Sequence, residues 1–297
     1  MSLITIFGSI DQGLIFGILS LGLYVAFRIL DLPDLTVDGS FVTGLAVSGM
    51  FALNGHPYLG VLFAIIAGFL AGAFTGLLHT KFNIQPILAG ILTMTGLYSI
   101  NLKIMDLKPS IIFYGKTTVF SFIEGKFSLG GVDVSKGVLL LLITIIIGGL
   151  LFWFLQTQIG LSLRATGDNE VMVRSSSINT DLMKIFGFGI CNALVGLSGA
   201  IYIQYNQQAS YTVGTGMLVL SLASIIIGEA LFSTKTLIRH LTSIVLGSVV
   251  YRIFIAFAFQ LGLAASDLKL FSAAIVIAAI SIPQIKPLIR KWRKAHA

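Results

Sequence analysis

Long apolar segments separated by short polar stretches run through the chain. A bilayer core about 30 Å thick is crossed by an α-helix of roughly 20 apolar residues, and most segments have that length. Their apolar residues are continuous, whereas strands of a membrane β-barrel alternate over about ten residues. The pattern predicts an all-α, polytopic transmembrane helical bundle of about nine spans in a single domain, 1–297; eight to ten spans are compatible with it. The spans are expected at roughly 7–28, 36–54, 58–79, 86–105, 137–157, 183–205, 214–232, 237–262 and 269–285.

The second predicted span differs from the others in its polar and glycine content. Three aspartates and a proline precede it or lie near its start, and its glycines recur at Gly39, Gly44 and Gly49. Such a segment crosses a membrane only as a broken helix that lines protein or a watery path. We therefore expect a broken second span, with a re-entrant or interfacial stretch as the alternative.

The composition agrees with a membrane protein. Of the 297 residues, 56% are hydrophobic and only 10% are charged, against roughly 25% charged residues in soluble domains. The net charge of +7 comes mostly from short loops and the tail 286–294, so membrane topology and anionic lipid headgroups explain it and no nucleic-acid partner is expected. Cys191 is the single cysteine and the four histidines are far apart in sequence, so no metal site is expected.

The distribution of lysine and arginine predicts an orientation in the cell membrane. If the loop 158–182 and the C-terminus are cytoplasmic, about twice as many basic residues lie inside as outside, as the positive-inside rule requires. Nine spans then place the N-terminus outside. The loop 106–136 becomes external, and its mixed apolar and polar sequence predicts that it packs on the outer face.

The cytoplasmic loop has the features of a capped, exposed helix. Asp168 is the expected N-cap of a short helix beginning near Asn169, Glu170 adds negative charge to its first turn, and Gly167 allows a sharp turn before it. Val171 and Met172 give this helix an apolar face that suits a groove on another protein. An interfacial helix lying on the membrane is the alternative.

Three strings resemble those of a known family. Gly160–Glu170, reading GLSLRATGDNE, is similar to the coupling loop of permeases in the branched-chain amino acid and ribose ABC importer family. The strings LTVDGSF at 35–41 and IGEALF at 227–232 resemble a subfamily predicted to import tryptophan or tyrosine. The order and spacing of the spans resemble this family over nearly the whole chain.

The resemblance implies an architecture and a division of labour. Two permease copies form the solute path, an ABC ATPase subunit binds ATP and Mg²⁺, and an extracytoplasmic binding protein delivers the solute. This chain would then be no enzyme and would hold no cofactor; a homodimer is expected, with a heterodimer of related permeases as the alternative. The residues expected to couple to the ATPase are Gly160, Leu163, Arg164, Gly167, Asp168, Asn169, Glu170, Val171 and Met172.

Polar residues within the spans are the candidates for a solute path. Asp38 is expected near the inner end of its span, where a simple polar anchor is the alternative role, and Glu229 is expected to pair with Arg239. Arg252 lies about 15 residues into the eighth span and needs a partner there, from the protein or from a solute carboxylate. The expected path residues are Thr36, Asp38, Ser40, Asn192 and Arg252.

Small residues recur every four positions in the third span, at Gly68, Gly72 and Gly76. Such a face lets two helices approach closely. We expect this contact inside the subunit, with a dimer contact as the alternative.

The sequence therefore predicts an importer permease for a small polar solute, with an amino acid expected and an aromatic one favoured by the resemblance. An ion-gradient-driven secondary transporter is the alternative, but it needs buried mid-membrane carboxylates and paired broken helices. A membrane-embedded enzyme needs convergent His, Asp or Glu within the spans, and the sequence has few of these.

Overall fold

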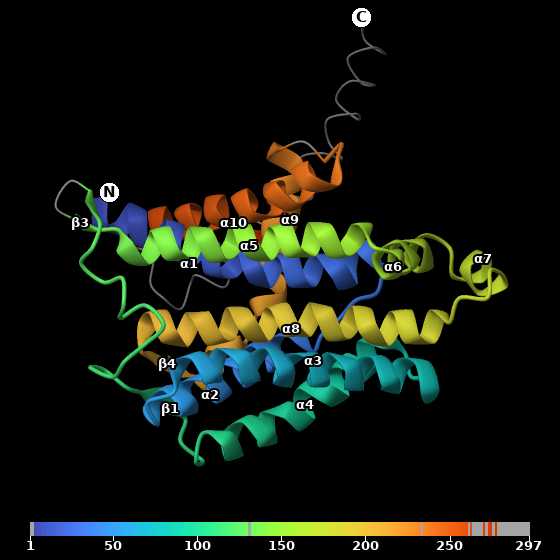
Figure 1. Ribbon diagram of the computed structural model, residues 1–297, viewed down its shortest axis with the longest axis horizontal. Helices are drawn as coiled ribbons and strands as arrows, with labels where there is room; N and C mark the ends of the chain where they lie inside the picture. Colours follow the sequence, from blue (N-terminus) through green and yellow to red (C-terminus); the bar gives the residue numbers. More distant parts are fainter. Residues whose placement is uncertain are drawn as a thin grey trace, which may run out of the picture.

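The computed structural model describes residues 3–129, 132–232 and 234–260, with isolated positions up to 277, as a bundle of helices (Figure 1). The helices are α1 (Leu3–Tyr24), which continues as a π-helical turn (Val25–Ile29), α2 (Val37–Leu53), α3 (Pro57–Lys81), α4 (Pro86–Ile104), α5 (Ser135–Gln156), α6 (Gln158–Asp168), α7 (Glu170–Ser175), α8 (Thr180–Asn206), α9 (Met217–Leu231) and α10 (Leu237–Gln260). A 3₁₀ turn (Tyr211–Gly214) precedes α9. The short strands are β1 (Ser110–Ile112), β2 (Ser128–Leu129), β3 (Val132–Asp133) and β4 (Gln208–Ser210).

Seven helical segments in the described residues are long and apolar enough to cross a membrane, and α2 is a shorter apolar helix. These eight correspond to the first eight predicted spans. The predicted ninth span, 269–285, and the basic tail lie outside the continuously described residues, so the count of nine is not confirmed.

The predicted break in the second span is not confirmed either. Residues Val37–Leu53 form one uninterrupted helix despite their three glycines, because each glycine packs against a neighbouring helix or strand. The irregular backbone lies before this helix, between the π-helical turn and α2.

Figure 1 places α6 and α7 at one end of the bundle and the strands β1, β3 and β4 at the other. Strand β1 pairs antiparallel with β4, with Ser110 opposite Ser210, which ties the long loop after α4 to the end of α8. Phe113 and Phe120 of this loop are buried. The loop thus packs on the end of the bundle opposite α7.

Helices α1 and α8 occupy the interior, whereas α4 and α5 expose most of their apolar side chains, as expected of lipid-facing helices. The three small positions of α3 lie directly against α8: side chains at Gly68, Gly72 and Gly76 would meet the backbones of Asn192, Phe188 and Ile185, respectively. The prediction that this glycine face packs inside the subunit is confirmed.

Candidate functional site

The loop between α5 and α8 folds into two consecutive helices, each with a capping side chain. The Thr157 hydroxyl accepts a hydrogen bond of 3.2 Å from the Gly160 N–H at the start of α6. The Asn169 amide oxygen accepts one of 3.0 Å from the Met172 N–H at the start of α7. The prediction that Asp168 is the N-cap is wrong by one residue. Asp168 ends α6, and Asn169 has the extended backbone that a cap residue requires.

The predicted coupling residues divide into a buried set and an exposed set. Leu163 is fully buried, and a side chain at Gly160 or Gly167 would meet the backbone of a neighbouring turn. Val171 and Met172 are 80% and 67% exposed. The structure therefore contains the uncovered apolar face expected on the short helix. Asp168 and Asn169 are also exposed, while Arg164 and Glu170 are partly buried.

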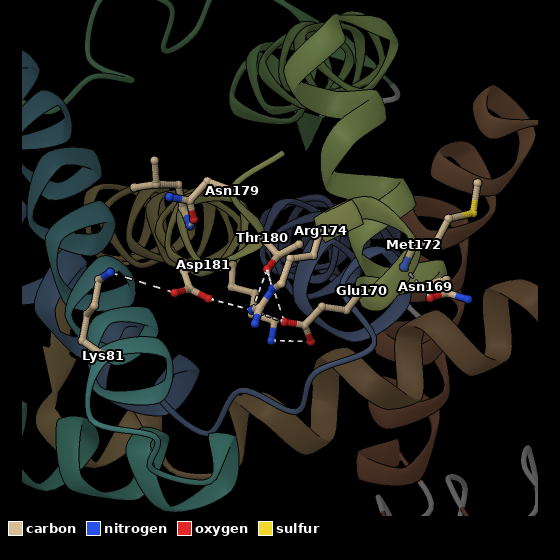
Figure 2. A network of polar contacts seen from close by, with 10 residues as sticks. Lys81, Asn169, Glu170, Met172, Arg174, Asn179, Thr180 and Asp181 are labelled. Atoms are coloured by element: carbon tan, nitrogen blue, oxygen red, sulfur yellow. Dashed lines mark hydrogen bonds and ion pairs between the residues drawn. The ribbon is translucent and has the colours of Figure 1, made fainter. Parts of the chain in front are cut away.

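A polar network fastens α7 to α8, and Figure 2 shows Met172 pointing away from it. The Glu170 carboxylate accepts hydrogen bonds from Lys184 Nζ at 2.7 Å and from an Arg174 guanidinium nitrogen at 2.9 Å. Arg174 also contacts Asp181 at 3.2 Å, and Lys81 of α3 lies 3.9 Å from Asp181. The hydrogen bond from Lys184 lowers the pKa of Glu170 below its ordinary value, with further lowering from the charges of Lys184 and Arg174.

Three members of this network are not predicted from the sequence, because an apolar pattern does not assign partners to charged residues at helix ends: Lys81, Asp181 and Lys184. Glu170 and Arg174 are four residues apart, a spacing that favours an ion pair on a helix and could have indicated that contact.

Asp38 lies well inside the bundle. The hydroxyls of Thr36 and Thr75 are 2.7 Å apart, and Thr75 precedes the end of α3 by six residues, or about 9 Å of helix. Gly39 packs against Met94, midway along α4. Asp38 therefore lies in the first turn of its helix, as expected, but this turn lies inside the bundle instead of at its end. The span begins within the bundle because the chain reaches α2 through irregular backbone.

The Asp38 carboxylate sits at the start of α9. Its oxygens accept hydrogen bonds from the Gly216 N–H at 2.9 Å and the Leu218 N–H at 2.8 Å. A negative charge at a helix N-terminus is stabilised by the helix dipole. Asp38 also lines a cavity of about 310 Å³ between α2, α4 and the 3₁₀ turn.

Thr36, Ser40 and Asn192 are fully buried inside the subunit. The Asn192 amide donates a hydrogen bond of 2.6 Å to Asp34, whose other oxygen accepts the Thr36 N–H at 2.8 Å. Asp34 is a buried carboxylate that precedes α2 in sequence and is not among the predicted path residues. A role for these three residues in a solute path remains a prediction.

Arg252 is paired within the chain, as predicted. Its guanidinium donates a hydrogen bond of 3.1 Å to the Gln12 side chain and lies 4.6 Å from the centre of the Phe16 ring. The partner that the protein supplies is therefore an amide oxygen together with an aromatic face. Ser248, one turn away, donates to the Gly13 carbonyl at 2.7 Å.

The expected pair between Glu229 and Arg239 is replaced by another. Glu229 accepts a hydrogen bond from Arg28 Nε at 2.8 Å and lies 2.9 Å from a ring nitrogen of His240. These contacts join the π-helical turn after α1 to α9 and α10. Packing of three helix ends, rather than proximity in sequence, selects the partners.

Residues 5–280 match the model of a family described as the permease component of the branched-chain amino acid transport system. The chain belongs to this family. It is 40% identical over 283 residues to a tyrosine transport system permease protein of Clostridioides difficile, covering 94% of this chain and 92% of that relative. It is also 26% identical over 201 residues to a ribose import permease protein of Escherichia coli, covering 66% of this chain and 60% of that relative.

A solved structure has the same fold. The permease resembles a chain of PsaBC from Streptococcus pneumoniae in complex with Fab, with a TM-score of 0.51 and 16% identity over 94% of this chain and 90% of that chain. Family membership and the apolar helices make this chain a multi-pass membrane permease of the ABC transporter type. ATP hydrolysis in such systems is carried by a separate subunit, and a substrate-binding partner is implied.

Proposed function

We propose that this permease is the membrane subunit of an ABC importer for an amino acid with an aromatic side chain, and that two copies form the path. The observation that carries the coupling role is the exposed pair Val171 and Met172 on a capped helix fixed to α8. The relative that is 40% identical over nearly its whole length is a tyrosine transport permease, which supports the solute class.

The packing suggests how the coupling residues share the work. Val171 and Met172 enter a groove on the ATPase, with Asp168, Asn169 and Glu170 at its rim. The remaining coupling residues, Gly160, Leu163, Arg164 and Gly167, hold α6 against the bundle. Gly167 packs so closely against the Ile29 carbonyl that no side chain would fit between them. Movement of the ATPase is therefore transmitted through α6 to the end of the first helix.

The same assignment orients the protein. With α7 in the cytoplasm, the loop 106–136 is extracytoplasmic, where the binding protein delivers the solute. The described apolar helices then place the N-terminus outside. The predicted span 269–285, which lies outside the continuously described residues, is expected to return the basic C-terminal tail to the cytoplasm, in keeping with the positive-inside rule.

Transport by the reconstituted complex tests the function. The permease is purified with its ATPase, placed in proteoliposomes and supplied with the binding protein. We expect ATP-dependent uptake of L-tyrosine or L-tryptophan in preference to L-leucine and ribose. Uptake driven by an ion gradient without the ATPase would instead establish a secondary transporter, and preference for ribose or leucine would overturn the aromatic assignment.

The coupling surface has its own test. Val171→Ser combined with Met172→Ser should lower affinity for the ATPase at least tenfold, since a buried interface anchor contributes about 2 kcal/mol. Phe122→Ser is the matched control, because Phe122 is 51% exposed on the loop at the opposite end. Equal ATPase affinity in both variants would contradict the assignment.

A further inference from the structure

The cavity beside Asp38 has the size and lining of a small-molecule site. Its volume of about 310 Å³ is at the lower end of the range of about 300–1,000 Å³ that ligand pockets occupy. Apolar atoms, including those of the tyrosine rings, form most of its wall. The polar side chains that line it are Asp38, Thr95, Tyr98, Asn101, Tyr211 and Thr215.

Asn101, which also lines this cavity, has an unused hydrogen-bond acceptor. Its side chain is 2% exposed, and its amide nitrogen donates a hydrogen bond of 3.2 Å to the Gly39 carbonyl. That bond fixes the orientation of the amide. The amide oxygen is buried and has no hydrogen-bond partner among the described residues. Because buried polar atoms nearly always have a hydrogen-bond partner, we expect a bound molecule to supply a donor to this oxygen.

Asp38 supplies acceptors on the same cavity. A carboxylate has about four lone-pair sites, and the N–H groups of Gly216 and Leu218 use two of them. Among the described residues lining the cavity, none is a lysine or arginine. The favoured occupant of the remaining sites is therefore a positively charged donor.

Two tyrosines form an aromatic wall. The Tyr98 and Tyr211 rings have their centres 5.6 Å apart at an interplanar angle of 77°. Tyr98 is 49% exposed, so its ring remains open to a ligand. Aromatic rings attract both the edge of another aromatic ring and a cation.

We propose that this cavity binds the protonated amino group of the transported solute through Asp38 and the Asn101 oxygen, with the solute's aromatic ring against Tyr98 and Tyr211. The inference rests on the proposed function for its solute class. It explains how the path distinguishes an amine from a sugar, because a sugar has hydroxyl donors but no positive charge for Asp38.

Cysteine labelling tests the charge of the cavity without knowledge of the solute. The substitution Thr95→Cys is made in the permease of the permease–ATPase complex. The only other cysteine of the permease, Cys191, is buried. We expect trimethylammonioethyl methanethiosulfonate to react about tenfold faster than its sulfonatoethyl counterpart, since Asp38 attracts one reagent and repels the other. The ratio of the two rates with a small free thiol in solution provides the reference.

Two further measurements assign the effect to the amino group. Asp38→Asn should abolish the preference for the cationic reagent; if that variant does not fold, protection of Thr95→Cys decides. Tyramine and L-tyrosine at millimolar concentration should slow labelling at least threefold, hydroxyphenylpropionate should not, and Asn101→Leu should weaken the protection. Equal rates for the two reagents, or equal protection by the deaminated acid, would overturn the proposal.

The outcomes separate this inference from the proposed function. A complex that imports tyrosine while Thr95→Cys shows no charge preference refutes the amine site alone. A complex with the charge preference and tyramine protection that does not import aromatic amino acids refutes the proposed solute class alone.

Discussion

Replacing Glu170 by glutamine removes the negative charge on which the α7 network converges. In the folded protein the carboxylate accepts hydrogen bonds from Lys184 at 2.7 Å, Arg174 at 2.9 Å and Thr180 at 3.3 Å. The Lys184 side chain is 13% exposed, whereas that of Arg174 is 62% exposed. The loss of stability in Glu170→Gln therefore arises mainly at Lys184, because its charge stays largely buried but no longer has a negative partner in Glu170.

The size of the effect follows from these exposures. A hydrogen bond to a charged group contributes about 1.5–3 kcal/mol, but an exposed ion pair contributes only about 0–1 kcal/mol. Since Glu170 is itself one-third exposed, we take the lower part of the first range for Lys184 and neglect Arg174. Glu170→Gln should then lower the local stability of α7 by about 1.5 kcal/mol, which raises the population of its opened state roughly tenfold.

Hydrogen exchange measures this opening. In the detergent-purified complex, the amides of 172–179 should exchange about tenfold faster in Glu170→Gln, while those of α10 remain unchanged. Glu124→Gln is the matched control: it breaks a 2.7 Å pair with Lys136 at the other end of the bundle and should leave α7 unaffected. Unchanged exchange of 172–179 in Glu170→Gln would refute the reasoning, as would equal acceleration in the control.

The pKa of Glu170 and three contacts elsewhere in the bundle lead to four more predictions. Protection of the α7 amides from hydrogen exchange, corrected for the intrinsic exchange rate, should be complete above pH 4.5. It should be lost as pH falls through the lowered pKa of Glu170, because the folded state favours the ionised carboxylate. The variant Glu170→Gln should lack this transition. Gly167→Val should displace α6 from the Ile29 carbonyl, lowering transport-coupled ATPase activity while membrane insertion is retained. Gly72→Leu should lower stability by about 3 kcal/mol or more in thermal melts because α8 backbone occupies the space, whereas Gly96→Leu, which meets open space, should not. Arg252→Leu should assemble but lose about 1–2 kcal/mol, since its bond to Gln12 and its contact with Phe16 disappear.

The helices could be predicted from the sequence because lipid imposes one simple requirement. A backbone in hydrocarbon must satisfy its own hydrogen bonds, so each long apolar run becomes a helix. The predicted span 58–79 and the observed Pro57–Lys81 therefore differ by a few residues only. The glycine face of α3 was equally predictable, because its four-residue repeat has a direct geometric meaning.

Partners of buried polar groups could not be predicted in this way. Asp34 bonds to Asn192, 158 positions along the chain, and Arg28 to Glu229, 201 positions away. An apolar pattern states which faces are buried but carries no information on which helices meet. The sequence favoured Arg239, across the next short loop, as the partner of Glu229. The packing of α1 against α9 instead brings Arg28 to Glu229.

The positions of the two aspartates near the start of α2 have a common structural basis. The backbone before α2 and the backbone before α9 are both irregular, so each helix begins inside the bundle with unpaired N–H groups. Asp34 accepts the Thr36 N–H at the start of α2, and Asp38 accepts N–H groups at the start of α9. Asp34 is further closed off by Asn192 and is 1% exposed, so it holds the fold together. Asp38 differs because it lines a cavity. The same local requirement thus produces one carboxylate that is sealed inside the subunit and one beside a cavity.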